Sequence, residues 1–480
     1  MAEREREGQR PATLAVLGGG PGGYAAAFRA ADLGLQVTLI DPEPSLGGVC
    51  LHRGCIPSKA YLHVANLLEE ARAAREYGLS FAQPDIDLDR MRQWKNEVVG
   101  ALAGGLDSLA KARRIERVQA RAVVRGGHDV ELQRLDGDIS TRRFDYLLLA
   151  TGSRPALPAP LDLDSELVMN STDALELASV PRRLLVVGAG YVGLELATVY
   201  AALGSRVRVV EATGEIVPGM DRDLARVLEK QLAPRLEAIV TSARITDLAE
   251  SDGGVIAHIE SDGSAADERF DAVLVAVGRL PNSSGLGLSS TRVAVDKRGF
   301  VLVDATRRTA EPSIYAIGDL VGGPMLAHKA THEGIVAAEA IAGHASAFEP
   351  NAVPAVVYTD PEIAWCGLGA QEAKEIGIEA ETVRYSWAGS GRARTLGAAE
   401  GLTKLTVETR SRRILGAAMV GRGAGELISE AALAIEMGAL AEDVMATIHP
   451  HPSLSENFME AAAAACGASV HLPPARRRRS

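Results

Sequence analysis

The stretch TLAVLGGGPGGYAAAFRAADLGLQVTLID, residues 13–41, decides the fold of this chain. An apolar strand over 13–17 leads into a turn with glycines at 18, 20 and 23, and then into an apolar helix over 24–33 that Gly34 closes. A second strand over 36–40 ends in Asp41. Such glycines let backbone amides at a helix N-terminus approach a pyrophosphate, and the acid can accept hydrogen bonds from a ribose. The stretch therefore predicts a dinucleotide-binding unit.

The same layout occurs a second time. The second copy consists of a strand over 184–187, glycines at 188, 190 and 193, a helix over 194–203 closed by Gly204, and a strand over 206–210 that ends in Glu211. Each half also contains a later apolar strand that runs into a glycine, at 146–152 and at 272–278. One glycine turn could be a plain connection without a ligand, but the joint recurrence predicts two Rossmann-like nucleotide-binding domains in tandem. No arginine directly follows Glu211, and an acid there repels a 2′-phosphate, so NAD is favoured over NADP.

The remainder of the chain has a different pattern. Strands and turns after Pro281 lead into Gly318-Asp319 and an apolar helix over 327–342. From about residue 351, apolar strands at 402–407 and 414–420 are mixed with a helix at 426–437, which is an α+β pattern. The predicted fold class is α/β, with a small central domain and a C-terminal α+β domain. The predicted domains are 1–154 and 155–281 for the two nucleotide-binding units, 282–349 for the central domain and 350–480 for the C-terminal domain.

Composition excludes several classes of function. The 480 residues are 47% hydrophobic and carry a formal net charge of -11, with a pI near 5.5. This charge argues against a nucleic-acid or anionic-membrane partner, and four arginines at 476–479, expected to form a solvated end, do not reverse it. No apolar run approaches the roughly 20 residues of a membrane span. Residues 1–10 lack the apolar core of a signal peptide, so a cytoplasmic location is expected.

Two of the four cysteines lie close together, in GGVCLHRGCIPSK at 47–59. They precede a predicted helix with Pro57 in its first turn, and a helix N-terminus would lower the thiolate pKa of Cys55, as a redox thiol requires. Metal binding is the alternative. Because Cys366 and Cys466 are isolated, the chain offers no second cysteine pair at ligand spacing. A redox-active disulfide is therefore favoured, and no metal site is predicted.

A histidine motif lies near the C-terminus, HPHPSLSE at 449–456. A histidine oriented by a carboxylate can take protons from a thiol near neutral pH, so His451 and Glu456 form a candidate acid-base pair. An isolated His-Pro turn would more often be structural. The cysteine pair elsewhere in the chain is what favours the catalytic interpretation.

Together these motifs resemble those of the flavoprotein disulfide reductases, and most closely those of the bacterial dihydrolipoamide dehydrogenases. The resemblance runs from about Ala12 to Leu472 and includes STDALEL at 171–177, GAGYVGLE at 188–195 and AIGDLVGGPMLAHKATHEG at 316–334. It implies an enzyme that oxidises protein-bound dihydrolipoyl groups with NAD, by way of FAD, as the E3 component of 2-oxo acid dehydrogenase complexes. It also implies a homodimer, joined through the C-terminal domain, in which the subunits share each active site.

The resemblance assigns the reacting groups. Cys50 would exchange with the substrate, Cys55 would form the thiolate beside the flavin, and His451 with Glu456 would serve the other subunit's site. Lys59 would lie near flavin N5, paired with Glu195. The implied cofactor-binding residues are, in chain order, Gly18, Gly20, Pro21, Gly22, Gly23, Asp41, Gly48, Val49, Cys50, Lys59, Ala122, Thr151, Gly152, Ser153, Gly188, Ala189, Gly190, Tyr191, Val192, Gly193, Glu211, Ile245, Val277, Gly278, Arg279, Gly318, Asp319, Met325, Leu326, Ala327 and His328.

Some residues depart from the family pattern. Asp41 replaces a glutamate, Ala122 a glycine and Pro450 a small residue, while His52 and Arg53 replace an Asn-Val pair and are expected to alter the thiolate pKa. Two alternatives stay open: a disulfide reductase for another dithiol, and a complex-docking subunit with secondary redox activity. Glutathione-type reduction would require arginines after the second acid, and mercuric reduction an extra C-terminal cysteine pair; the sequence has neither.

Overall fold

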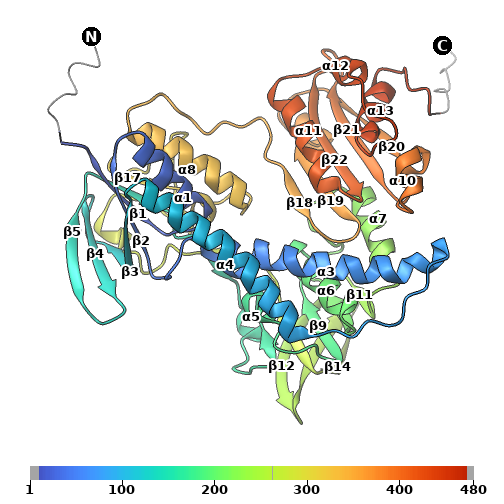
Figure 1. The fold of residues 1–480 in the computed structure, drawn as a ribbon, viewed down its shortest axis with the longest axis horizontal. Coiled ribbons are helices and arrows are strands. Elements are labelled where there is room, and N and C mark those ends of the chain that lie inside the picture. Colours follow the sequence, from blue (N-terminus) through green and yellow to red (C-terminus); the bar gives the residue numbers. More distant parts are fainter. Residues whose placement is uncertain (1–9, 262, 473–480) are drawn as a thin grey trace.

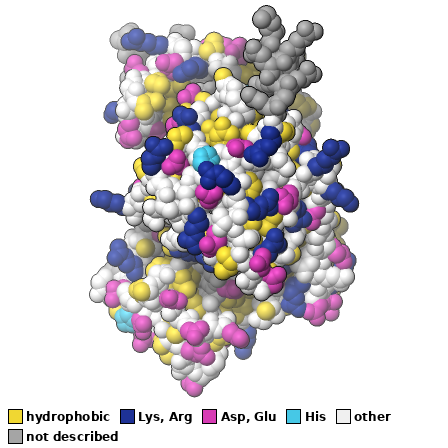
Figure 2. Space-filling model, turned by 90° about the vertical axis from the view of Figure 1, so that its left-hand side faces the viewer, with side chains coloured by type: hydrophobic (Ala, Val, Ile, Leu, Met, Phe, Trp, Pro, Cys, Tyr) yellow, Lys and Arg dark blue, Asp and Glu magenta, His cyan; other side chains and the backbone are white. Residues whose placement is uncertain are grey.

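The computed structural model describes residues 10–261 and 263–472, and Figure 1 shows two α/β units followed by a C-terminal α+β unit. The arginines at 476–479 and residues 1–9 lie outside the described residues, so the expectations for both ends stay predictions. No helix in the described part of the chain is long and apolar enough to cross a membrane. On the face shown in Figure 2, basic and acidic side chains are interspersed.

The first unit is built on a seven-stranded sheet of order β17-β6-β1-β2-β3-β4-β5. Its strands are β1 (Thr13–Leu17), β2 (Gln36–Asp41), β3 (Glu116–Val124), β4 (Asp129–Arg134), β5 (Ile139–Arg143), β6 (Tyr146–Leu149) and β17 (Ile314–Ala316). Its helices are α1 (Pro21–Asp32), α2 (Gly48–Arg53), α3 (Cys55–Ala73), the 3-10 turn η1 (Ala74–Tyr77), α4 (Leu88–Ala112) and α8 (Ala327–Ile341). The central strands pair in parallel and are buried on both faces, which explains their continuous apolar runs.

The segment predicted as a central domain returns to this first unit. β17 pairs in parallel with β6, and α8 packs along α1, as Figure 1 also shows. Gly334 of α8 lies so close to α1 that a Cβ there would be 2.5 Å from the Gly22 carbonyl oxygen. Residues 282–349 therefore complete the first sheet from its β6 edge. The boundaries near 154, 281 and 350 stay predictions.

The second unit repeats the arrangement with a five-stranded parallel sheet of order β11-β10-β9-β15-β8. Its strands are β8 (Val168–Met169), β9 (Arg183–Val187), β10 (Arg206–Val210), β11 (Ala238–Val240) and β15 (Ala272–Val275), and its helices are α5 (Ser171–Glu176), α6 (Tyr191–Ala202) and α7 (Arg222–Leu232). A three-stranded antiparallel sheet joins it, formed by β12 (Ala243–Ser251), β13 (Gly254–Ser261) and β14 (Ser264–Phe270). The two units are connected by the antiparallel pair β7 (Ser153–Pro155) and β16 (Arg279–Pro281). Short 3-10 turns are η2 (Ala159–Leu161), η3 (Leu288–Ser290) and η4 (Gly318–Val321).

The C-terminal unit is a five-stranded antiparallel sheet covered by helices on one face. Its elements are β18 (Ala355–Val357), β19 (Glu362–Gly367), α9 (Ala370–Glu375), β20 (Ala380–Ser386), η5 (Trp387–Gly389), α10 (Gly391–Thr395), β21 (Leu402–Glu408), β22 (Ile414–Gly421), α11 (Ala424–Glu436), α12 (Ala441–Ala446) and α13 (Glu456–Ala465). Alternate residues of β19 separate the two faces: Ala364 and Cys366 pack under the helices, whereas Ile363 packs in the core shared with the second unit. The helices α11 and α13 thus lie on the face turned away from that unit.

Candidate active site

The first glycine turn has the form of an anion cradle. Gly18 has φ +110°, and a Cβ there would lie 2.3 Å from the Ala150 carbonyl oxygen. A Cβ on Gly23 would lie 1.9 Å from the Gly18 carbonyl oxygen. Glycine at 23 thus lets the helix approach the turn, and glycine at 18 lets the turn approach the end of β6. Helix α1 begins at Pro21 without a side-chain cap, which leaves its N-terminus available for a phosphate. This geometry fits the FAD pyrophosphate.

The two acids predicted to bind ribose occupy matching positions. Asp41 ends β2 and accepts hydrogen bonds from the Gly19 N–H and, at 2.8 Å, from the Glu43 N–H. Burial raises the pKa of Asp41, although these two donors oppose the shift. Glu211 follows β10 and accepts the Ala189 N–H at 2.8 Å through one carboxylate oxygen, while the other accepts the Thr213 N–H at 2.8 Å. Each carboxylate therefore ties the end of its strand to its own glycine turn.

A cavity of about 670 Å³ opens at the second glycine turn. It brings together ten of the predicted cofactor-binding residues: Gly188, Gly190, Tyr191, Val192, Glu211, Ile245, Val277, Gly278, Arg279 and Met325. Prolines 155, 158, 160 and 218 form part of its wall and were not predicted. Gly193 lies behind the turn, where a Cβ would be 2.0 Å from the Gly188 carbonyl oxygen. The size and the acid at one side suit a dinucleotide without a 2′-phosphate.

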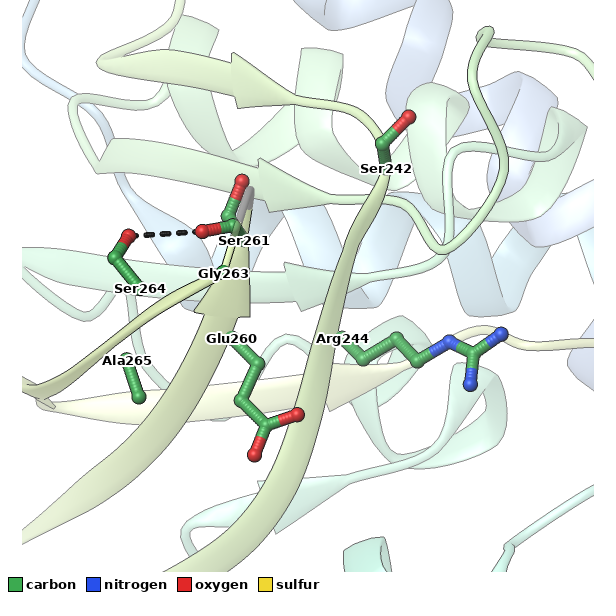
Figure 3. Close-up of a pocket in the computed structure, with 7 residues that line it drawn as sticks. All are labelled: Ser242, Arg244, Glu260, Ser261, Gly263, Ser264 and Ala265. Atoms are coloured by element: carbon green, nitrogen blue, oxygen red, sulfur yellow. Dashed lines mark hydrogen bonds between the residues drawn. The ribbon is translucent and has the colours of Figure 1, made fainter.

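A second, shallower hollow of about 380 Å³ lies on the neighbouring three-stranded sheet (Figure 3). It is lined by Ser242, Arg244, Glu260, Ser261, Gly263, Ser264 and Ala265. The Ser264 hydroxyl donates to the Ser261 carbonyl oxygen at 2.8 Å, so part of its polar lining is already paired. None of the predicted site residues lies there.

The two cysteines flank a helix break. Cys50 lies within α2, Gly54 interrupts the helix, and Cys55 is the first residue of α3, with both thiols free. The side-chain hydrogen bond between the two sulfur groups lowers the pKa of Cys55 to about 7, helped by the positive charge of Lys59, and raises the pKa of Cys50. Of the two cysteines, Cys55 is therefore the one whose environment favours the thiolate, chiefly through Cys50 and Lys59, and its assignment as the thiolate beside the flavin stays a prediction.

Lys59 and Glu195 form the ion pair that the family resemblance implies. Lys59 Nζ lies 2.7 Å from Glu195 Oε2, and the Glu195 side chain is only 4% exposed. The other oxygen, Glu195 Oε1, accepts the Tyr358 N–H at 3.0 Å. Lys59 Nζ also lies 4.5 Å from the centre of the Tyr358 ring. Tyr358 belongs to the C-terminal unit and was not predicted, because no local pattern of the sequence marks this contact.

A polar cluster joins the two nucleotide sites. Arg279 Nε donates to Ser153 Oγ at 2.7 Å, and the Ser153 hydroxyl donates to the Asp319 carboxylate. The Thr151 hydroxyl donates to the carbonyl oxygen of Asn282 at 3.1 Å, and the Asn282 amide returns a hydrogen bond to the Thr151 carbonyl at 2.9 Å. Strand ends from both units therefore meet here, which brings together predicted residues far apart in the chain.

The remaining predicted positions divide into two groups. Those at the glycine turns or at helix starts are Gly20, Gly22, Gly48, Val49, Gly318, Leu326, Ala327 and His328, and Gly152 lies between β6 and β7. Gly48 of α2 lies against the first turn, where its Cβ would be 2.6 Å from the Cα of Gly20. Ala122 differs from them because it is 9% exposed and packs with Val130 and Leu132 in the core of the first unit. A side chain at 122 therefore faces the core.

His451 is exposed on the helical side of the C-terminal unit. Its Nδ1 lies 2.8 Å from Glu456 Oε1, and the Ser453 N–H donates to Glu456 Oε2 at 2.7 Å. The His451 side chain is 79% exposed in the single chain, so its Nε2 edge is open to a partner or substrate. The side chain of the neighbouring His449 is only 5% exposed, with Nε2 2.7 Å from Glu430 and Nδ1 2.9 Å from the Thr447 carbonyl oxygen.

The substitutions between the cysteines have a structural explanation. His52 Nε2 lies 2.9 Å from the Leu46 carbonyl oxygen, and Arg53 forms an ion pair with Glu43 at 2.7 Å. Both side chains thus hold the loop that follows Asp41. The main influences on the Cys55 pKa are Cys50, burial, Lys59 and Glu195. An effect of His52 and Arg53 on that pKa stays a prediction.

Comparison with known proteins shows the family to which this chain belongs. The pyridine nucleotide-disulphide oxidoreductase family matches residues 12–334, and the dimerisation domain of that family matches residues 353–462. The chain therefore belongs to the pyridine nucleotide-disulphide oxidoreductases, and it is an enzyme that uses FAD and NAD(H) and forms a homodimer.

Individual relatives show which members of the family this chain is similar to. The dihydrolipoyl dehydrogenase of Haemophilus influenzae is 44% identical over 463 residues, covering 96% of this chain and 97% of that protein. The dihydrolipoyl dehydrogenase of Geobacillus stearothermophilus is 42% identical over 458 residues, covering 95% and 97%. The crystal structure of LpdA from Mycobacterium tuberculosis superposes with a TM-score of 0.87 at 28% identity, covering 94% of this chain and 99% of that one.

Proposed function

We propose that this enzyme is a dihydrolipoyl dehydrogenase that oxidises protein-bound dihydrolipoyl groups and reduces NAD⁺ to NADH. The observation that carries the proposal is the thiol pair, with Cys55 at the start of α3, its pKa lowered to about 7, beside the Lys59–Glu195 ion pair. The similarity to dihydrolipoyl dehydrogenases over nearly the whole chain supports the choice of dithiol.

The chain's own residues account for the thiol chemistry. A thiolate of the dihydrolipoyl group attacks Cys50 Sγ of the oxidised pair, the Cys50–Cys55 bond breaks, and Cys55 leaves as the thiolate. The second substrate sulfur then attacks the mixed disulfide, which releases the oxidised lipoyl group and leaves Cys50 reduced. His451, held in orientation by Glu456, takes the proton of the attacking substrate thiol, and the proton of the second thiol goes to Cys50 as it leaves. In the homodimer we assign His451 to the partner subunit's thiol pair.

The cofactor-binding residues complete the proposal. We assign FAD to the cradle of Gly18 to Gly23 with Asp41, and NAD to the cavity beside Glu211. When bound, FAD would supply the chemistry that takes up the electron pair released as the Cys50–Cys55 disulfide re-forms and that passes it on to NAD⁺ as hydride. The Glu211 carboxylate, already ordered by two backbone donors, selects against a 2′-phosphate.

The proposed partners are lipoyl domains of 2-oxo acid dehydrogenase complexes, for which this enzyme would be the E3 component. The proposed location is the cytoplasm. The isolated thiols of Cys366 and Cys466 suit a reducing compartment. Capture of the purified enzyme by the core subunit of such a complex, measured against a core subunit without its peripheral subunit-binding domain, tests the partnership.

An anaerobic titration of the purified holoenzyme with dihydrolipoamide tests the activity. We expect a long-wavelength absorbance band from the thiolate beside the flavin, which disappears as NAD⁺, but not NADP⁺, is converted to the reduced form. Cys55→Ser should lose the band, whereas Cys466→Ser, a change of the same kind at an isolated cysteine, should keep it. If glutathione or another dithiol produces the band and dihydrolipoamide does not, the proposed substrate is wrong.

A further inference from the structure

Three parts of the chain meet at the Lys59–Glu195 pair. Lys59 is on α3 of the first unit, Glu195 is on α6 of the second, and Tyr358 follows β18 of the C-terminal unit. Tyr358 makes two contacts, donating its backbone N–H to Glu195 at 3.0 Å and placing its ring 4.5 Å from Lys59 Nζ. Each carboxylate oxygen of Glu195 therefore has one partner: Oε2 contacts Lys59, and Oε1 accepts the Tyr358 N–H.

We propose that Tyr358 is a positioning residue, whose ring holds the Lys59 ammonium beside Glu195 and so sustains the Cys55 thiolate. This inference deepens the proposed function, because it concerns the same thiol pair. The negative face of an aromatic ring attracts a cation, and the attraction grows when water is excluded. The ring covers Lys59, whose side chain is 33% exposed, from the C-terminal side.

The thiolate depends on this arrangement through two opposite charges. The Lys59 ammonium lowers the pKa of Cys55, whereas the Glu195 carboxylate raises it. If the Tyr358 ring is removed, the Lys59 ammonium moves toward water and lowers the pKa of Cys55 less. Glu195 stays in place on α6, because residue 358 still donates its backbone N–H to it. The titratable groups that face the thiols and the ring are Cys50, Lys59, Glu195, Tyr24, Tyr191, Glu362 and Glu426.

The side chain of Tyr358 allows a matched pair of variants. Tyr358→Phe keeps the ring and removes only the hydroxyl, for which no hydrogen bond is formed within the described residues. Tyr358→Leu removes the ring and keeps the backbone N–H that Glu195 accepts. Both variants keep an apolar side chain, so we expect both to fold. Thermal unfolding and gel filtration establish that each is a folded dimer before its Cys55 pKa is compared with that of the wild type.

The measurement is the pH dependence of alkylation of Cys55 in the reduced holoenzyme, with iodoacetamide and peptide mass spectrometry. We expect the apparent pKa of Cys55 to rise by about 0.5 or more in Tyr358→Leu and to stay at the wild-type value in Tyr358→Phe. Lys59→Met should raise it as well, and adding Tyr358→Leu to Lys59→Met should raise it no further, because both changes remove one interaction.

Each outcome decides the inference. An unchanged pKa in Tyr358→Leu overturns it, and so does an equal rise in Tyr358→Phe or a further rise in the double variant. Because alkylation requires no substrate, the test is independent of the proposed activity. A wild-type enzyme that fails to oxidise dihydrolipoamide but shows the Tyr358→Leu shift would contradict the proposed function and leave this inference standing.

Discussion

Replacing Glu456 by glutamine tests the proposed proton carrier most directly. One carboxylate oxygen of Glu456 lies 2.8 Å from His451 Nδ1, and the other accepts the Ser453 N–H at 2.7 Å. Glutamine has a single acceptor oxygen, and its amide nitrogen is a donor. Only one of the two N–H groups can therefore keep its acceptor in the variant, and the orientation of the His451 ring is no longer fixed from both sides.

The size of the effect follows from these contacts. A hydrogen bond to a charged group contributes about 1.5–3 kcal/mol, and we take the lower part of this range because His451 is 79% exposed in the single chain. A loss of about 1.5–2 kcal/mol corresponds to a decrease of roughly 10- to 30-fold in kcat/KM for dihydrolipoamide. Burial alone would raise the pKa of Glu456, but the Ser453 N–H and His451 outweigh it and lower the pKa. The carboxylate is thus ionised at neutral pH, and the decrease should persist from pH 6 to 9.

The assay is steady-state oxidation of dihydrolipoamide with NAD⁺ across that pH range. Glu460→Gln is the matched control, because Glu460 lies on the same helix and pairs with His471 Nδ1 at 2.6 Å but belongs to no proposed site. NADH oxidation by an artificial acceptor, which bypasses the dithiol, should decrease much less in Glu456→Gln. A Glu456→Gln enzyme within twofold of wild type over the whole range would refute the reasoning.

The remaining predictions concern the thiol pair and the two glycine turns. The pKa of Cys55 is lowered from 9.0 to about 7 in the folded protein. Its thiolate therefore stabilises the reduced fold fully above pH 9, and this stabilisation is lost as the pH falls through 7. The difference in Tm between the reduced wild type and reduced Cys55→Ser should thus grow from pH 7 to pH 9. Glu211→Gln should raise the ratio of kcat/KM for NADP⁺ to that for NAD⁺ by about tenfold, and an unchanged ratio would remove Glu211 from cofactor selection. Gly18→Ala places a Cβ 2.3 Å from the Ala150 carbonyl oxygen at φ +110°, so the purified variant should have a lower Tm and retain little FAD, which absorbance of the released flavin measures.

The sequence predicted well those features that depend on neighbouring residues. Each glycine turn lies in one short segment with its strands, its helix and its acid, Asp41 or Glu211. The pattern of neighbouring residues therefore directly specifies the local geometry. The start of a helix at Cys55 was predictable for the same reason, because Pro57 marks the first turn locally. The resemblance to a family supplied the pairing of Lys59 with Glu195, which no spacing could have indicated.

Contacts between distant segments were not predictable in this way. The contribution of Tyr358 depends on how the C-terminal unit docks against two other units, and nothing in the residues around 358 records that docking. His52 and Arg53 lie beside the thiols in the sequence, but their side chains contact Leu46 and Glu43 in the loop that follows Asp41, which no local pattern indicated.

The junction at Glu195 also has a consequence for the order in which the enzyme matures. Glu195 is 136 residues from Lys59 and 163 residues from Tyr358, so its two partners come from opposite directions along the chain. During synthesis from the N-terminus, the two nucleotide-binding units can close on themselves before residue 358 leaves the ribosome. The backbone and ring contacts of Tyr358 with the Lys59–Glu195 pair can then form only after the C-terminal unit has docked, so this junction is completed last.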